Sequence, residues 1–217
     1  MSSDNIEDLQ IESYQYFPTT IYSIHIPQFL DIAKEVAEEY LKLNDRELNE
    51  IYPVRMSQNF VHDSRLFEFN TFVNQTGWDI LNSQGYHMSQ FNTFLVELWA
   101  QQHYKHSLME QHVHGNGAQL VGFYFLESPE NSSRAVFHDP RPSKVIMNLP
   151  ENDMMQVTSA TNIINFDPKP GTMIISNSWL PHSFSRNSSD NPFTFIHFNI
   201  GFAPAIQTTD SSNAEII

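Results

Sequence analysis

The sequence contains no cysteine, so disulfide bonds, thiolate metal ligands and a cysteine nucleophile are all excluded. Basic residues are also few, because 11 Lys and Arg stand against 25 Asp and Glu, and they are scattered along the chain. A formal net charge of −14 repels phosphate backbones, so we expect no nucleic acid among the partners. The same acidity also keeps a protein soluble, and it identifies no partner by itself.

The sequence also lacks long apolar runs, since none approaches the roughly 20 residues that a membrane-spanning helix needs. Residues 1–8 are polar and acidic and have no apolar segment like that of a signal peptide. We therefore expect a soluble, cytoplasmic protein that does not bind membranes. Nucleophile elbows, Gly-x-Gly-x-x-Gly motifs and phosphate-binding loops are absent as well, so nothing supports nucleophilic hydrolysis.

Aromatic residues, in contrast, are plentiful: they make up 13 % of the chain and include 17 phenylalanines. A disordered chain would be poorer in them, so a packed globular protein is expected. A length of 217 residues suits one domain with a sizeable core. We predict a single domain over residues 1–217, with loose ends at residues 1–12 and 206–217.

Two amphipathic helices are predicted in the N-terminal third of the chain. After Pro27, apolar residues recur at helical spacing from Phe29 to Leu41, with charged residues on the other face. A second helix is predicted from Leu66 to Leu81, and Gly85 is a stop signal beyond it. Both helices are expected to pack on a sheet rather than to carry the chemistry.

From residue 87 onward the pattern changes to short segments rich in β-branched and aromatic residues, separated by turns that contain Pro, Asn and Gly. Strands are predicted at 91–99, 120–126, 134–137, 144–147, 156–166, 172–176 and 193–202. Many short strands joined in this way are typical of a sandwich or jelly roll. The predicted fold class is therefore mainly β (α+β in a loose sense), a jelly roll with N-terminal packing helices.

Three of the ten histidines form a pattern that favours metal binding. His112 and His114 are two residues apart, and in an extended segment such residues point to the same face. Both imidazoles can then reach one ion at about 2.0–2.2 Å. His182 follows the predicted strand 172–176, and strands distant in sequence are neighbours in a jelly roll. We therefore predict one metal site on His112, His114 and His182, which leaves coordination positions open for substrate and oxygen.

Several short motifs follow one another along residues 14–202 in a defined order. They are Tyr16-Phe17-Pro18-Thr19-Thr20-Ile21, Glu97-Leu98-Trp99, His112-Val113-His114, Gly122-Phe123-Tyr124-Phe125-Leu126, Phe137-His138-Asp139-Pro140-Arg141, Trp179-Leu180-Pro181-His182-Ser183 and Phe198-Asn199. Their order and spacing resemble those of the 2-oxoglutarate- and iron(II)-dependent oxygenases with the double-stranded β-helix fold. More narrowly, the chain resembles a subgroup common in marine bacteria and their phages.

The resemblance implies Fe(II) at the predicted site, 2-oxoglutarate as co-substrate, and hydroxylation of an unidentified small-molecule or peptide substrate. It also implies that His112 and His182 are iron ligands, whereas the superfamily usually has Asp or Glu at the position of His114. Three neutral imidazoles leave Fe(II) with its full +2 charge, and zinc becomes a stronger competitor. Glu110, Asp139 or an exogenous anion are the candidates for the missing negative charge.

The resemblance further implies a basic residue on the strand after the distal histidine, paired with the far carboxylate of 2-oxoglutarate. The equivalent position here is Phe193. The candidates for binding the co-substrate are therefore Arg186, Arg141, Arg134, Tyr124 and Asn199. If no arginine substitutes, the co-substrate site is lost or changed.

By alternation, Phe193, Phe195, His197 and Asn199 share one face of the predicted last strand. That face is expected to line the pocket, with Phe193 and His197 among the lining residues. The alternative is equally compatible with the sequence: Phe193 and Phe195 belong to the core and His197 is an ordinary edge residue.

Two other functions fit the same residues. The missing acidic ligand and the missing arginine favour a non-catalytic jelly-roll binding or structural protein, possibly phage-related, that retains the three-histidine metal site. A structural zinc ion held by the same histidines is the other alternative.

Overall fold

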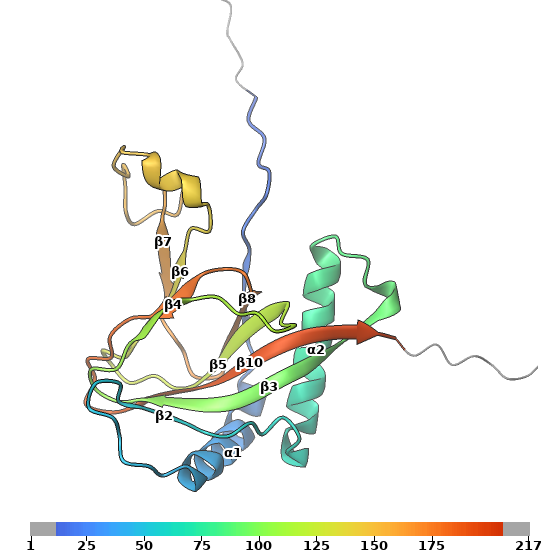
Figure 1. Cartoon of the computed structure of the whole chain (residues 1–217), viewed down its shortest axis with the longest axis vertical. Coiled ribbons are helices and arrows are strands. Elements are labelled where there is room, and N and C mark those ends of the chain that lie inside the picture. Colours follow the sequence, from blue (N-terminus) through green and yellow to red (C-terminus); the bar gives the residue numbers. More distant parts are fainter. Residues whose placement is uncertain (1–11, 206–217) are drawn as a thin grey trace, which may run out of the picture.

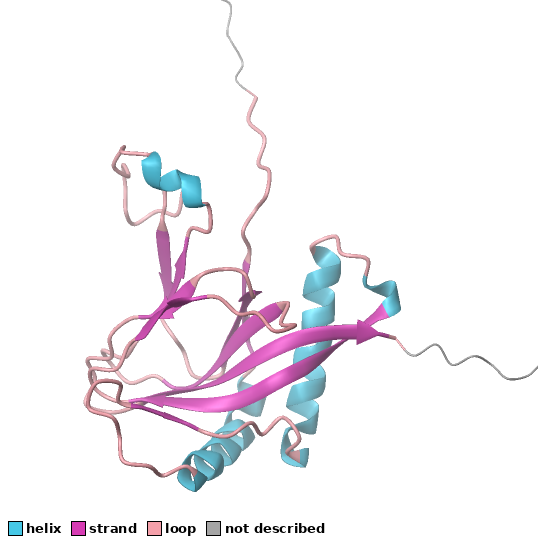
Figure 2. Cartoon of the chain, viewed as in Figure 1, coloured by secondary structure: helices cyan, strands magenta, loops and turns pink. Residues whose placement is uncertain are grey.

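The computed structural model describes residues 12–205, and ten strands in two antiparallel sheets dominate this part of the chain (Figures 1 and 2). The six-stranded sheet has the order β1 (Ile21–His25), β8 (Thr172–Asn177), β5 (Leu120–Glu127), β10 (Phe193–Pro204), β3 (Phe91–His103) and β2 (Val54–Met56). The four-stranded sheet has the order β4 (Met109–His112), β9 (His182–Phe184), β6 (Ala135–His138) and β7 (Ile163–Phe166). Apart from residue 12, the predicted loose ends lie outside the described residues.

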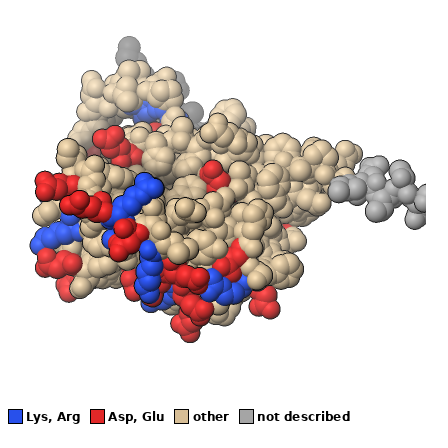
Figure 3. Space-filling view, turned by 60° about the horizontal axis from the view of Figure 1, so that its bottom comes forward, with Lys and Arg blue, Asp and Glu red and all other residues tan. Residues whose placement is uncertain are grey.

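Two helices, α1 (Leu30–Leu43) and α2 (Phe67–Ser83), cover one face of the six-stranded sheet (Figure 1). They bury an apolar stripe that includes Val36, Leu41 and Val73, while charged residues of both signs remain intermixed on the outer surface (Figure 3). Short 3-10 segments at Pro27–Phe29, Ser64–Leu66 and Met88–Gln90 lead into α1, α2 and β3. In the described residues no helix is both long and apolar enough to cross a membrane.

Alternation along the central strands separates two cores. On β5, Leu120, Tyr124 and Leu126 pack toward the helices, whereas Phe123 and Phe125 pack between the two sheets. The helix-facing layer is tight enough to require glycine at position 122, where an added Cβ would lie 2.1 Å from the Phe198 ring. The space between the sheets is filled mainly by phenylalanines from β5, β6, β9 and β10.

The predicted helices and the jelly-roll fold class with N-terminal packing helices are confirmed. Five predicted strands are present with shifted ends, and β3 continues to His103, beyond the predicted end at residue 99. The prediction of strand at 144–147 is wrong, because Pro142–Ile146 forms a 3-10 helix, and only residues 163–166 of the predicted 156–166 strand are extended.

The two errors lie in one connection, the segment between β6 and β7. It projects away from the sheets (Figure 1), and its apolar side chains remain exposed, among them Val145, Met155 and Val157. Apolar residues there have no neighbouring strand to pair with, so their β propensity is not realised. The short strands β1, β2, β4 and β9 were not predicted, since three to five residues carry little periodic signal.

Candidate metal site

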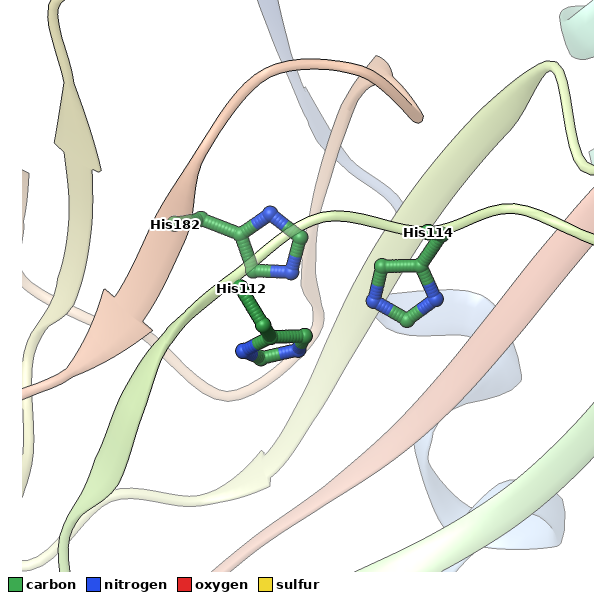
Figure 4. A group of neighbouring side chains, drawn as sticks. All are labelled: His112, His114 and His182. Carbon is green, nitrogen blue, oxygen red and sulfur yellow. The ribbon is translucent and has the colours of Figure 1, made fainter.

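The three histidines of the predicted metal site come together at adjoining ends of two neighbouring strands (Figure 4). Strands β4 and β9 are antiparallel, and His112 is the cross-strand partner of His182. His114 lies two residues beyond His112, and its backbone N–H donates to the carbonyl of Ser178 at 2.9 Å. This bond ties the segment after β4 to the loop that precedes β9, so the fold itself holds the third imidazole beside the other two.

His112, His114 and His182 each offer one ring nitrogen, and these three nitrogens lie within 4.8 Å of one another. The ring centroids are 4.5 Å apart for His112 and His182, and 5.1 Å apart for each of the two pairs that include His114. This spacing allows one ion to be reached from three sides with small adjustments of the side chains.

Second partners fix the orientation of two of these rings. Nδ1 of His112 lies 2.8 Å from the carbonyl oxygen of Glu110, and Nδ1 of His182 lies 2.9 Å from that of Leu180. A carbonyl only accepts, so each Nδ1 carries the proton and each Nε2 keeps its lone pair. Nε2 of His182 and Nε2 of His114 are buried without a hydrogen-bond partner. Unpartnered imidazole nitrogens on neighbouring rings are groups that a divalent ion can satisfy.

Burial keeps the imidazoles of His114 and His182 neutral. It lowers the pKa of His182 to about 3, although the carbonyl of Leu180 opposes the shift. It also lowers the pKa of His114 to about 4, with a further contribution from the neighbouring His112. Because only the neutral ring binds a metal, protons do not compete for these two ligands near neutral pH.

The inward-facing side chains of β3 and β10 lie next to the three histidines, on the side toward the protein interior. His197 pairs with Trp99 across the strands, and Asn199 pairs with Glu97. The His197 ring stacks on Trp99 at 4.1 Å and on His114 at 4.9 Å. Deeper in the same face, Phe193 and Phe195 are fully buried within the aromatic core between the sheets.

Tyr124 does not reach this face. It points toward the helices, its ring lies 5.2 Å from Phe69, and its hydroxyl donates to the carbonyl of Ile26 at 2.9 Å. Its neighbour Phe123 occupies the inward position instead, because alternate residues of β5 face opposite cores. The expectation that Tyr124 binds the co-substrate therefore conflicts with the structure.

Each of the three candidate arginines contacts a group outside the histidine cluster. Arg141 forms a double contact with Asp139 at 2.7 and 2.9 Å, and Arg134 forms an ion pair with Asp167 at 2.6 Å. Arg186 is exposed and contacts Nδ1 of His106 at 3.0 Å. Among residues 12–205, no Lys or Arg is buried. Of the candidates for co-substrate binding, only Asn199 lies beside the histidines.

The expected sources of negative charge are likewise displaced. Asp139 is paired with Arg141 and Lys144, and Glu110 contacts His112 only through its backbone carbonyl. One acidic side chain, Glu97, is joined to this region, because it accepts a hydrogen bond from Asn199 at 3.0 Å. This pair was not predicted from the sequence. Alternation along β3 and β10 indicates which residues face inward, but which residues are opposite each other depends on the register between the two strands.

Comparison with known proteins was consistent with this arrangement. Residues 97–199 match the family described as "Putative 2OG-Fe(II) oxygenase". This segment runs from Glu97 to Asn199 and includes all three histidines. No curated protein sequence matched.

Three solved structures illustrate the likeness in fold. A prolyl-4-hydroxylase from Pseudomonas putida is 10 % identical, with a TM-score of 0.56 over 87 % of this chain and 94 % of that chain. HygX from Streptomyces hygroscopicus with nickel, 2-oxoglutarate and hygromycin B bound is 13 % identical, with a TM-score of 0.55 over 84 % and 83 %. A viral collagen prolyl hydroxylase from Paramecium Bursaria Chlorella virus-1 is 12 % identical, with a TM-score of 0.51 over 83 % and 94 %. At these identities the likeness concerns the fold alone.

Proposed function

We propose that the chain is a 2-oxoglutarate-dependent dioxygenase that holds Fe(II) on His112, His114 and His182, since residues 97–199 match the family described as "Putative 2OG-Fe(II) oxygenase". The observation that carries the proposal is the convergence of these three side chains, with one ring nitrogen of each within 4.8 Å of the other two. When bound, Fe(II) and 2-oxoglutarate would supply the oxidative chemistry, in which O2 converts the co-substrate into succinate and CO2 and the second oxygen atom hydroxylates a C–H bond of the substrate.

The residues around the site have separable roles in this proposal. The carbonyls of Glu110 and Leu180 orient the rings of His112 and His182. Phe123 and Phe137 lie 5.4 and 6.1 Å from His182, ring to ring, and exclude water on the inner side. The substrate class is a small molecule or a peptide, and it approaches the partly exposed side formed by His112 and His114.

The two ends of 2-oxoglutarate fit this site unequally. Its 2-oxo acid end needs only two free positions on the metal, which three protein ligands leave open. Its far carboxylate is ordinarily matched by a cation, and the buried residues between Glu12 and Ala205 include no Lys or Arg. The buried polar groups beside the histidines are neutral, and they include His197 and Asn199.

An anaerobic titration tests the proposal. We expect 2-oxoglutarate to produce a metal-to-ligand absorption band in the Fe(II)-loaded protein and, after oxygen is admitted, to be converted into succinate. His182→Ala should abolish both signals, whereas His138→Ala should retain them, because His138 points away and contacts Ser183 at 2.9 Å. Absence of both the band and succinate from the iron-loaded wild type would refute the proposal.

A second candidate is a non-catalytic jelly-roll protein that keeps the metal site. It is favoured by Phe193, which is fully buried among Phe125, Phe184 and Phe195 at the position where the resemblance implies a basic residue. This candidate predicts tight metal binding without any effect of 2-oxoglutarate. Elemental analysis of protein purified without added metal also distinguishes this candidate from the dioxygenase, because a structural site should contain zinc rather than iron.

A further inference from the structure

His197 is a buried polar side chain beside the metal site whose role the three metal ligands do not explain. It is 1 % exposed, and neither of its ring nitrogens has a hydrogen-bond partner. A neutral imidazole offers one N–H donor and one acceptor. Leaving both unmet in a buried position is costly, so such a group normally marks a bound molecule or water.

The surroundings of His197 point to a ligand near the metal rather than to the metal itself. Its ring stacks on Trp99 and on His114, and the Phe123 ring lies 5.4 Å away. The set of nitrogens close enough to share one ion contains His112, His114 and His182, without His197. The imidazole therefore lies against the predicted metal ligand His114 without being one of the candidate ligands itself.

His197 is also part of a row of unsatisfied polar atoms. On the inward face of β3 and β10 the cross-strand pairs are Glu97 with Asn199, Trp99 with His197, Gln101 with Phe195 and His103 with Phe193. Along this face the atoms without partners are Asn199 Oδ1, both nitrogens of His197 and His103 Nδ1. All three side chains are neutral hydrogen-bonding groups. Of these, His197 contacts both the predicted metal ligand His114 and Phe123 of the aromatic core.

We propose that His197 donates a hydrogen bond to the far carboxylate of the 2-oxo acid that binds at the metal, in place of the basic residue implied at position 193. The inference rests on the proposed function, since it specifies how that site recognises its co-substrate. A hydrogen bond from a neutral imidazole to a carboxylate selects a dicarboxylate by about ten- to a hundredfold. An arginine, which adds charge and a second hydrogen bond, would select more strongly.

The test compares two 2-oxo acids by calorimetry on nickel-loaded protein, which binds without turnover. The ligands are 2-oxoglutarate and 2-oxopentanoate, which has the same carbon chain without the far carboxylate. We expect wild type to prefer 2-oxoglutarate by about ten- to a hundredfold. His197→Phe keeps an aromatic ring between Trp99 and His114 but removes both nitrogens, so it should lose the preference and leave 2-oxopentanoate binding unchanged.

His103→Phe is the matched control. His103 is also fully buried on the inward face, but it already has a partner, because Nε2 lies 3.1 Å from Gln101 Oε1. We expect this variant to keep the wild-type preference. His197→Gln, which restores an N–H donor, should recover part of it. If His197→Phe does not take up nickel, His197→Leu provides the nitrogen-free comparison.

The outcomes separate this inference from the proposed function. Equal affinity of wild type for the two acids overturns the role of His197 and leaves the dioxygenase proposal intact. So does a preference that survives in His197→Phe, or one that is lost only in His103→Phe. If nickel-loaded wild type binds neither acid, the proposed function itself fails, and the role of His197 fails with it.

Discussion

The two faces of the six-stranded sheet are built from the same strands, yet they bury different kinds of side chain. On the helix side, Leu98, Ile196 and Ile200 pack against α1 and α2 in a core that is almost wholly aliphatic and aromatic. On the other side, His197 alternates along β10 with Phe195 and Phe193, and both of its ring nitrogens lack a partner. Because apolar burial stabilises without regard to direction, the helix side supplies stability. The inner side supplies directed polar groups, which are the means of binding.

The largest expected effect is a loss of metal affinity when a histidine on the inner side of the sheet is replaced. His182→Ala removes a ligand whose Nε2 is buried without any other partner, so nickel or zinc affinity should fall by more than the roughly 10- to 100-fold that loss of a supporting partner costs. Calorimetry measures the affinity directly. His138→Ala, on the outward face of the neighbouring strand, should bind as wild type does, and equal affinity of the two variants would contradict the predicted site.

Leu98→Ala should produce the opposite pattern. Leu98 is fully buried between the sheet and the helices, and a cavity at such a position costs about 2–5 kcal/mol of unfolding free energy. Metal affinity should be unaffected, since the altered side chain faces away from the histidines. The free energy comes from urea unfolding of metal-free protein, and affinity is measured on the folded fraction. A loss of metal binding without loss of stability would show that the two faces are not independent.

The buried histidines predict a pH dependence that originates on the inner face. Burial lowers the pKa of His103 to about 4, whereas the unfolded chain has an ordinary value near 6.5. The unfolded state therefore takes up the proton first, and stability is full above pH 6.5 and falls as the pH drops toward 4. The contribution of His103 amounts to about 3 kcal/mol at most.

Urea midpoints of metal-free protein between pH 7.5 and about 4.5 measure this dependence. His103→Phe should show a shallower decline with pH than wild type, because it lacks the group that the unfolded state protonates. An identical decline in the two proteins would mean that His103 is not held neutral by burial.

Tyr124→Phe should have the smallest effect. The variant loses the hydrogen bond to the carbonyl of Ile26 within the helix-facing core, so the unfolding free energy should fall by about 1 kcal/mol. The affinity of nickel-loaded protein for 2-oxoglutarate should not change. A weaker affinity would mean that Tyr124 reaches the co-substrate after all, and the division between the faces would be wrong.

Features that depend on neighbouring residues along the chain were predictable from the sequence. Helical periodicity identified the segments that form α1 and α2, and alternation placed Phe193, Phe195, His197 and Asn199 on one face of β10. The pair of histidines two residues apart, together with the later His182, predicted the group that the fold brings together. In each case the information lies within a few residues or in residue chemistry.

Only the tertiary structure decided which side of the sheet each strand residue faces and which strands are neighbours. It turned Tyr124 toward the helices and Arg141 toward Asp139, and it joined Glu97 to Asn199. These outcomes depend on strand register and on contacts between distant segments, because a shift by one residue exchanges the two faces of a strand. The sequence alone determined that three histidines and an aromatic core would be present, whereas packing decided that His197 would lie buried behind them without a partner.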